Sequence, residues 1–299
     1  MGDPNRRTIL ITGASGGIGK QTALALAEQG HVVIMHGRNP GKTRQAREWV
    51  VERSGNHDVH AHVADLSLMS EVSRFAAEMR SRYDRLDVLV NNAGGQFGGD
   101  REVTEEGHER TFAINTLQPF LLTSLLLPLL ERSPSARIVT VSSESYRQAG
   151  LPMLDDIELE HHYTMVRAYA FSKLYVWWLM RRFDARLKAS GITNVTVNTV
   201  EPGAALTALQ RDSLTKTPFM LPLLILWLPF MRTARHGART SVLMAASPTV
   251  EGVSGEFWGN RRPKRIDTKW VSEEGERRIW DYCEQACESY LHDGSVTAD

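Results

Sequence analysis

Cysteine is scarce in this 299-residue sequence, and a net charge is absent. Cys283 and Cys287 are the only cysteines, and no second Cys or His pair lies near them. We therefore predict reduced thiols, with neither a disulfide nor a bound metal. Lysine plus arginine and aspartate plus glutamate each number 35, so no charge excess favours nucleic acid. Because the N-terminus lacks an apolar signal region with a cleavage site, we expect a cytoplasmic protein.

An uninterrupted apolar run long enough to span a membrane is also absent. Residues 218–231 are fourteen consecutive apolar residues, whereas a spanning helix needs about 20. The three prolines within this run also forbid one regular helix. Basic residues flank it, as a helix lying on a membrane surface would require: Lys216, Arg232, Arg235 and Arg239. A lid over an apolar substrate, peripheral membrane contact through 217–232 and a homodimer contact all remain open.

Short runs rich in valine and isoleucine alternate with longer amphipathic stretches. The strand-like runs are residues 8–13, 31–37, 59–65, 86–94, 136–143 and 195–203, and the helical patterns are residues 18–29, 42–54, 69–82, 104–131 and 166–190. This alternation predicts a single α/β domain with a doubly wound (Rossmann-type) parallel sheet of about seven strands and helices on both faces. Three segments do not fit the alternation: 144–165, 207–235 and the tail after about 263. Within the tail, the spacing of apolar residues over 273–293 predicts an amphipathic helix.

The stretch "ILITGASGGIGKQTA" connects the first predicted strand to the first predicted helix. Gly13, Gly17 and Gly19 allow a tight turn and let the backbone approach a pyrophosphate. The helix that starts near Ile18 offers that anion its free N–H groups. The spacing G-x-x-x-G-x-G differs from the commoner G-x-G-x-x-G, and glycine-rich turns can also be plain turns. The position after the first strand favours dinucleotide binding.

The end of the second predicted strand bears on the choice of dinucleotide. An acidic residue there would bind the free ribose hydroxyl of NAD, whereas a basic one accommodates the phosphate of NADP. The sequence has Arg38 and no carboxylate at this place, and Ser15 adds a hydroxyl. These residues favour NADP(H) over NAD(H). Asp65, followed by Leu66, closes the third strand and either contacts the adenine or caps the next helix.

Polar residues that could perform chemistry follow the fourth and fifth strands and lie on a later helix. Tyr169 and Lys173 are four residues apart, so they share one helix face, and a nearby ammonium lowers a phenol's pKa. Ser143 ends the fifth strand, "NNAG" ends the fourth, and Asn115 lies in the helical pattern that follows it. Sites in open α/β sheets form at the carboxyl ends of strands, where these motifs fall.

With "TGASGGIG", "NNAG", "VSS" and "YAFSK" in this order, the chain resembles the short-chain dehydrogenase/reductases over residues 8 to about 262. "GIGKQTA", "VSSESY" and "ARTSVLMAASPTVEGVSGEFW" are similar to the retinol-dehydrogenase-like branch. The resemblance implies a catalytic domain over residues 1–262, with a substrate lid at 207–235, and a helical extension at 263–299.

The resemblance also implies a role for each matching residue. Tyr169 would exchange a proton with the substrate oxygen and Ser143 would hydrogen-bond that oxygen. Lys173 would lower the tyrosine pKa and hold the nicotinamide ribose, and Asn115 would hold a water that links Lys173 to solvent. The further residues expected to contact the cofactor are Leu66, Asn91, Ala93, Gly94, Pro202, Gly203 and Thr207.

The sequence departs from this family at two places. Glu201 precedes Pro202, where the retinol-type branch often has histidine. Ser143 and Tyr169 are 26 positions apart, wider than in most of the superfamily. His161 and His162 lie in that gap as candidate substrate contacts. We interpret them as solvated, because the sequence pairs them with neither a carboxylate nor a third ligand.

Two hypotheses of different classes follow. The first is an NADP(H)-dependent oxidoreductase that interconverts a carbonyl and a hydroxyl on a lipophilic small molecule. The second is a non-catalytic NADP(H)-binding sensor or scaffold. The set formed by Asn115, Ser143, Tyr169 and Lys173 favours the enzyme, because a scaffold has no need of a proton relay.

Overall fold

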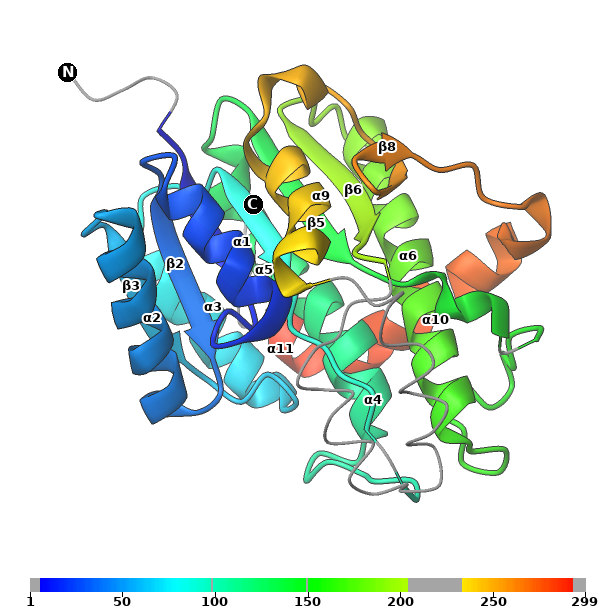
Figure 1. Cartoon of the computed structure of the whole chain (residues 1–299). Coiled ribbons are helices and arrows are strands. Elements are labelled where there is room, and N and C mark those ends of the chain that lie inside the picture. The colour runs from blue at the N-terminus through cyan, green and yellow to red at the C-terminus, as the bar shows by residue number, and fades with distance from the viewer. Residues whose placement is uncertain (1–5, 98, 149, 204–232, 293–299) are drawn as a thin grey trace.

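A mostly parallel sheet forms the centre of the molecule in the computed structural model, which describes residues 6–97, 99–148, 150–203 and 233–292 (Figure 1). Its strand order is β3-β2-β1-β4-β5-β6-β7-β8. The strands are β1 (Thr8–Ile11), β2 (Val32–Gly37), β3 (Val59–Val63), β4 (Val88–Asn91), β5 (Ala136–Val141), β6 (Val195–Glu201), β7 (Phe257–Gly259) and β8 (Arg262–Pro263). The predicted doubly wound sheet is confirmed. The sheet has eight strands in the described residues, in line with the expected number of about seven, and β7 and β8 are too short to show a periodicity.

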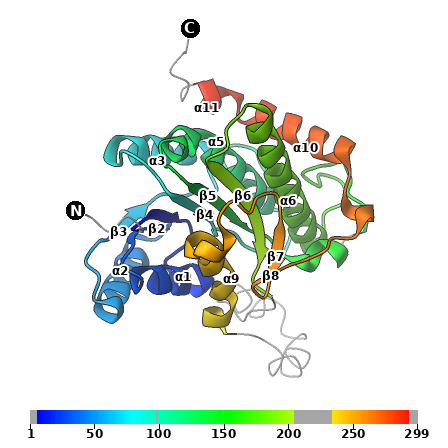
Figure 2. The same cartoon turned by 90° about the horizontal axis from the view of Figure 1, so that it is seen from above.

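Helices cover both faces of the sheet, as Figure 2 shows from above. One face carries α1 (Gly17–Ala27), α2 (Pro40–Ser54) and α9 (Ala234–Ala246). The other carries α3 (Met69–Arg82), α5 (Gln118–Glu131) and α6 (Met165–Ala189). Strands β1 and β4 are buried on both sides, which explains their continuous apolar sequences.

The helix expected over 104–131 begins later and is irregular. Gly107 has a φ of +90°, which a regular helix does not allow, so the helical chain starts with α4 (Arg110–Phe112). The Glu109 side chain caps it by accepting from the N–H groups of Thr111 at 2.9 Å and Phe112 at 2.7 Å. A π-helical turn, η1 (Ala113–Leu117), follows before α5. Among the helices of the described ranges, Arg110–Glu131 is long and apolar enough to cross a membrane, but 78% of its apolar window is buried, as in a core helix.

The C-terminal tail packs onto the outer face of α5 and α6 (Figure 2). It contains α10 (Glu273–Ala286) and α11 (Glu288–His292), so the single predicted helix is interrupted at Cys287. Trp280 lies edge-on to the rings of Phe120 at 5.1 Å and Phe183 at 4.7 Å between centroids. Both cysteines are buried and form no disulfide with each other in this structure. The tail is therefore part of the main hydrophobic core.

The buried carboxylate of Glu158 attaches the segment between Ser143 and Tyr169 to this tail. It accepts hydrogen bonds from the His108 ring at 2.8 Å, the Glu109 N–H at 2.5 Å and the Tyr282 hydroxyl at 2.6 Å. Trp177 and Trp178 on α6 are also buried. One carboxylate thus joins the segment between β5 and α6, the start of α4 and the tail helix α10.

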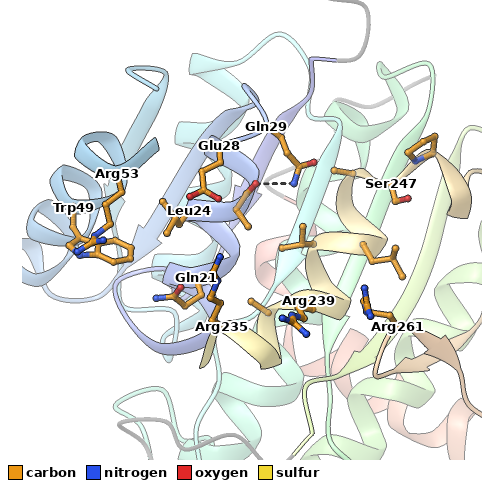
Figure 3. Close-up of a pocket in the computed structure, with 16 residues that line it drawn as sticks. Gln21, Leu24, Glu28, Gln29, Trp49, Arg53, Arg235, Arg239, Ser247 and Arg261 are labelled. Atoms are coloured by element: carbon orange, nitrogen blue, oxygen red, sulfur yellow. Dashed lines mark hydrogen bonds between the residues drawn. The ribbon is translucent and has the colours of Figure 1, made fainter. Parts of the chain in front are cut away.

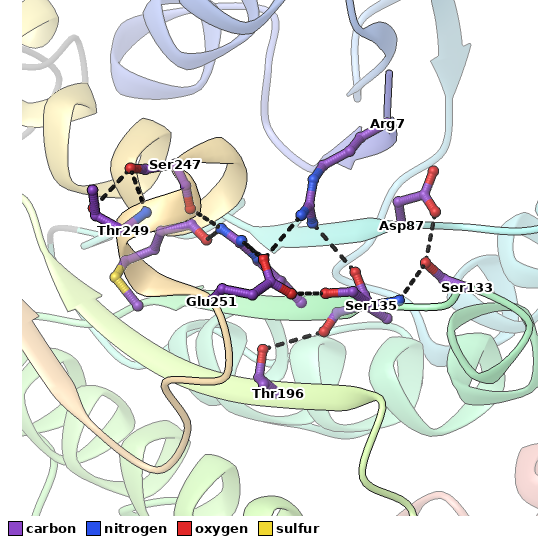
Figure 4. A network of polar contacts seen from close by, with 11 residues as sticks. Arg7, Asp87, Ser133, Ser135, Thr196, Ser247, Thr249 and Glu251 are labelled. Atoms are coloured by element: carbon purple, nitrogen blue, oxygen red, sulfur yellow. Dashed lines mark hydrogen bonds and ion pairs between the residues drawn. The ribbon is translucent and has the colours of Figure 1, made fainter. Parts of the chain in front are cut away.

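A second polar network closes the opposite end of the sheet, where the strands begin (Figure 4). Arg137 is 3% exposed and donates to the carbonyl oxygens of Met244 at 3.1 Å and Ser247 at 2.9 Å, which are orphan acceptors at the end of α9. Glu251 accepts from Arg137 and, at 3.4 Å, from Arg7. Charge-assisted hydrogen bonds therefore stabilise this end of the sheet. The short-chain-dehydrogenase motifs of the sequence lie at the other end.

Candidate active site

The glycine turn between β1 and α1 has the geometry of an anion-binding turn. Gly13 and Gly17 have φ values of +66° and +52°, which favour glycine. A Cβ atom on Gly19 would lie 2.4 Å from the carbonyl oxygen of Gly13, so the close packing also excludes a side chain. Helix α1 starts at Gly17, near the predicted Ile18, with neither a capping side chain nor an acidic residue in its first turn. Its first N–H groups therefore suit a pyrophosphate.

Thr12, directly after β1, and Asn92, directly after β4, connect this turn to the end of β4, and the sequence did not single them out. The Thr12 hydroxyl accepts from the N–H groups of Asn92 at 3.0 Å and Ala93 at 2.8 Å. The Asn92 amide donates to the carbonyl oxygens of Thr12 at 2.8 Å and Gly13 at 3.3 Å. The predicted Asn91 instead points into the core, where it donates to Thr123 at 3.0 Å and Thr140 at 3.2 Å. Neighbouring strand residues face opposite sides, so only one of the two asparagines can reach the turn.

The ends of β2 and β3 lie side by side and carry the residues expected at the adenosine end. Arg38 has an exposed side chain, 3.9 Å from a carboxylate oxygen of Asp65. The other Asp65 oxygen accepts from the N–H and hydroxyl of Ser67 at 3.1 and 2.7 Å. Asp65 thus orders its own turn and does not cap α3, and the Leu66 side chain is buried in the core. Gly37 lets Ser15 approach, since a Cβ there would lie 2.9 Å from the Cβ of Ser15.

Tyr169 and Lys173 lie on α6 beside the end of β5. The Lys173 ammonium is 5.7 Å from the centre of the Tyr169 ring and donates to the carbonyl oxygen of Val141 at 3.1 Å. Burial lowers the pKa of Lys173 to about 8. Burial raises the pKa of Tyr169, and its hydrogen bond with Ser143 opposes that rise. The lowering that we expected Lys173 to cause in Tyr169 is therefore not seen in this structure.

Asn115 reaches the same place from the π-helical turn. Its amide accepts from the N–H of Gly95 at 2.9 Å and donates to the carbonyl oxygen of Gly95 at 2.8 Å and the Ser172 hydroxyl at 2.9 Å. A Cβ on Gly94 would lie 2.7 Å from Asn115 Oδ1 and 3.2 Å from Lys173 Nζ, so both groups border the space above Gly94. The π-helical turn changes the direction in which the Asn115 side chain points, and a regular helical pattern could not predict this direction. The structure therefore brings Asn115, Ser143, Tyr169 and Lys173 together.

Glu201 forms part of a fixed ion cluster at the edge of this site. It accepts from the N–H of Gly203 at 2.7 Å, and Lys264 lies 2.6 Å from both Glu201 and Glu144. Lys264, which follows β8, thus connects the end of β6 to the residue after Ser143. Pro202 and Gly203 follow β6 at this edge. Thr207, most of the expected lid at 207–235 and the whole of 217–232 lie outside the described residues.

His161 and His162 are exposed, as interpreted from the sequence. The expectation that no carboxylate pairs them is wrong, because the ring of His162 lies 3.0 Å from Asp156. The same Asp156 accepts from the N–H groups of Glu160 at 2.6 Å and His161 at 3.2 Å. This carboxylate belongs to a local turn that sequence spacing does not reveal.

A cavity of about 940 Å³ lies away from these groups, between α1, α2 and α9 (Figure 3). Its rim carries Arg53, Arg235, Arg239 and Arg261, and its walls include Leu24 and Leu243. It contains none of the groups of the candidate active site, so we place the chemistry at the strand ends and not in this cavity.

A glycine turn at a helix N-terminus and a tyrosine–lysine pair at the carboxyl ends of parallel strands define a dinucleotide-dependent oxidoreductase of the doubly wound α/β class. The chain belongs to the short-chain dehydrogenase family, whose model, described as short chain dehydrogenase, matches residues 7–217, and within that family to the retinol-dehydrogenase-like branch. It is an oxidoreductase that acts on a hydroxyl or carbonyl group.

Named relatives and solved structures agree with this assignment. The chain is 38% identical to retinol dehydrogenase 14 of Homo sapiens over 95% of its own length and 88% of the relative. It is 34% identical to polyprenol dehydrogenase of Homo sapiens, over 94% and 84% of the two chains. A short chain dehydrogenase from Escherichia coli complexed with NADPH has a TM-score of 0.66 and 26% identity, over 86% and 97% of the two chains.

Proposed function

We propose that this protein interconverts a carbonyl and a hydroxyl on a lipophilic small molecule with NADP(H) as the cofactor. The observation that carries the proposal is the convergence of Ser143, Tyr169, Lys173 and Asn115 beside the glycine turn. Arg38 supports NADP(H), because it is exposed at the end of β2 and can form charge-assisted hydrogen bonds to a phosphate. The relatives named for retinol and polyprenol, and the apolar run at 218–231, support a lipophilic substrate in a cytoplasmic or membrane-associated setting.

The chain's own groups supply position and a proton. When bound, the nicotinamide group gives or accepts the hydride. The Tyr169 hydroxyl donates a proton to the carbonyl oxygen in reduction, and its phenolate form removes the proton of the substrate hydroxyl in oxidation. Ser143, hydrogen-bonded to Tyr169, orients that oxygen. The Lys173 ammonium and the Asn115 amide border one space and provide a path for the replacement proton.

The test is turnover by the purified protein with NADPH and a panel of aromatic, steroid, retinoid and polyprenyl carbonyls, followed by nicotinamide absorbance. We expect activity that Tyr169→Phe reduces at least about 1,000-fold while NADPH still binds. Tyr163→Phe is the matched control, because Tyr163 is a half-buried tyrosine outside this cluster. Tight NADPH binding without turnover on any carbonyl would support the sensor hypothesis, and an active Tyr169→Phe enzyme would refute the assigned proton transfer.

A further inference from the structure

One residue of β2 contacts the first two residues of the glycine turn at once. His36 is 3% exposed. Its ring Nδ1 lies 3.3 Å from the amide nitrogen of Gly13, and its carbonyl oxygen accepts from the N–H of Ala14 at 2.7 Å. Its other ring nitrogen, Nε2, lies 3.0 Å from the carbonyl oxygen of Ala64, which follows β3. The imidazole therefore connects the ends of two strands to the turn.

The partners of the ring determine its protonation. The Gly13 N–H can only donate and the Ala64 carbonyl can only accept, so Nε2 carries the hydrogen and Nδ1 does not. In a charged ring Nδ1 would also carry a hydrogen, so two N–H donors would face each other and the hydrogen bond from Gly13 would be lost. Burial favours the neutral ring and lowers the pKa of His36 to about 4. The hydrogen bond to Ala64 and the charge of Asp65 oppose this shift, and His62 supports it.

We propose that His36 is a positioning residue for the cofactor, which fixes Gly13 so that the turn is preformed for the pyrophosphate. The inference rests on the proposed dinucleotide-dependent function. Thr12 and Asn92 hold the turn only from the side of β4, and His36 holds it from the side of β2. Without this acceptor the Gly13 N–H loses its partner, and glycine is the residue with the most alternative conformations. His36 has no contact with the tyrosine–lysine pair, so it acts on binding and not on the chemical step.

Two variants separate the hydrogen bond from the packing of the ring. His36→Leu fills a similar volume without an acceptor, and His36→Asn retains an acceptor oxygen near the place of Nδ1 but cannot reach Ala64. We expect His36→Leu to raise the Kd and KM for NADPH about five- to tenfold, with kcat within about twofold of wild type. His36→Asn should recover most of that loss. In the cofactor-free protein, amide hydrogen exchange at Gly13 should be faster in His36→Leu than in His36→Asn, and ring ¹⁵N shifts of the wild type should show hydrogen on Nε2.

Wild-type NADPH affinity in a folded His36→Leu protein would overturn the inference. So would an equal loss in both variants, because that result would assign the effect to packing alone. A fall in kcat with an unchanged KM would contradict it as well. Failure of the proposed function is a different result, since it would be seen in the wild type as an absence of dinucleotide binding or turnover.

Discussion

Of the reactive side chains of α6, Lys173 is buried and Tyr169 is half-buried, and their lost hydration moves their pKa values in opposite directions. It lowers that of Lys173 and raises that of Tyr169, because in each case the charged form is the one that loses hydration. Each residue is thus pushed toward its neutral form in the cofactor-free protein. A buried ammonium with one carbonyl acceptor reduces stability, which a binding or catalytic role can explain.

Lys173→Met should therefore stabilise the cofactor-free protein. A lysine whose pKa falls from 10.5 to about 8 on folding costs about 3 kcal/mol at pH 7. The cost is complete below about pH 8 and fades as pH rises toward 10.5, because the group is then neutral in both states. Urea unfolding at pH 7 and pH 10 measures this difference, and Lys188→Met, at an exposed site on the same helix, should change little. Destabilisation by Lys173→Met at pH 7 would contradict the account.

Arg38 should determine the preference between the two dinucleotides. Its exposed guanidinium can form charge-assisted hydrogen bonds to a phosphate, each worth about 1.5–3 kcal/mol. We expect Arg38→Ala to weaken NADPH binding about tenfold or more and to change NADH binding about twofold or less. Isothermal titration with both cofactors measures it, and Arg44→Ala on the exposed side of α2 serves as the control. Equal losses for NADPH and NADH would refute the assignment.

At the scale of elements, the segment between β5 and α6 is held by contacts with distant parts of the chain. Glu158 joins it to α4 through His108 and to α10 through Tyr282. The carboxylate of Glu158 raises the pKa of His108, so their ion pair is a pH-dependent part of this connection. The order of this segment therefore depends on these tertiary contacts as well as on the local turn around Asp156.

Glu158→Gln should destabilise the protein most at mildly acidic pH. His108 has a raised pKa in the folded state, so its ion pair is fully present below about 6.5 and is lost as pH rises through the folded value. We expect a loss of about 1–3 kcal/mol at pH 6 that becomes smaller at pH 9. Thermal unfolding at the two pH values measures it, with Glu160→Gln as an exposed control in the same segment. A pH-independent loss would exclude His108 as the partner that matters.

At the scale of the whole molecule, residues 263–299 do not form a separate unit in the part that the structure describes. Ile279, Trp280, Cys283 and Cys287 are buried in the same cluster as Phe120 on α5. This packing explains why α5, an apolar helix, is not exposed on its outer face. The same packing covers this part of α5 and α6 against a second subunit.

Deletion of residues 263–299 should therefore leave a protein that aggregates or unfolds, because it exposes the apolar outer face of α5 and α6. A milder change, Trp280→Ala, should cost about 3–5 kcal/mol through the cavity that it leaves. Glu284→Ala, on the exposed side of the same helix, should cost less than about 0.5 kcal/mol. Size-exclusion chromatography and urea unfolding measure these effects. A soluble, monomeric deletion variant with wild-type stability would show that residues 263–299 are not needed for the core.

The sequence by itself determined the parallel sheet, the glycine turn and the tyrosine–lysine spacing. Local periodicity and short motifs are enough to predict these features. The connections between parallel strands also have one preferred handedness, which limits the possible topologies. The strand order then places the ends of β1, β4 and β5 together, so the positions of Gly13, Ser143 and Tyr169 follow from the motifs.

Only the tertiary structure decided which side chains meet across long sequence separations. The contact of His36 with Gly13, the choice of Asn92 over Asn91 and the connection of Glu158 to Tyr282 depend on strand register and on the side of each strand that a residue faces. Burial, which sets the pKa values of Tyr169 and Lys173, is likewise a property of the packed molecule and not of the spacing of residues.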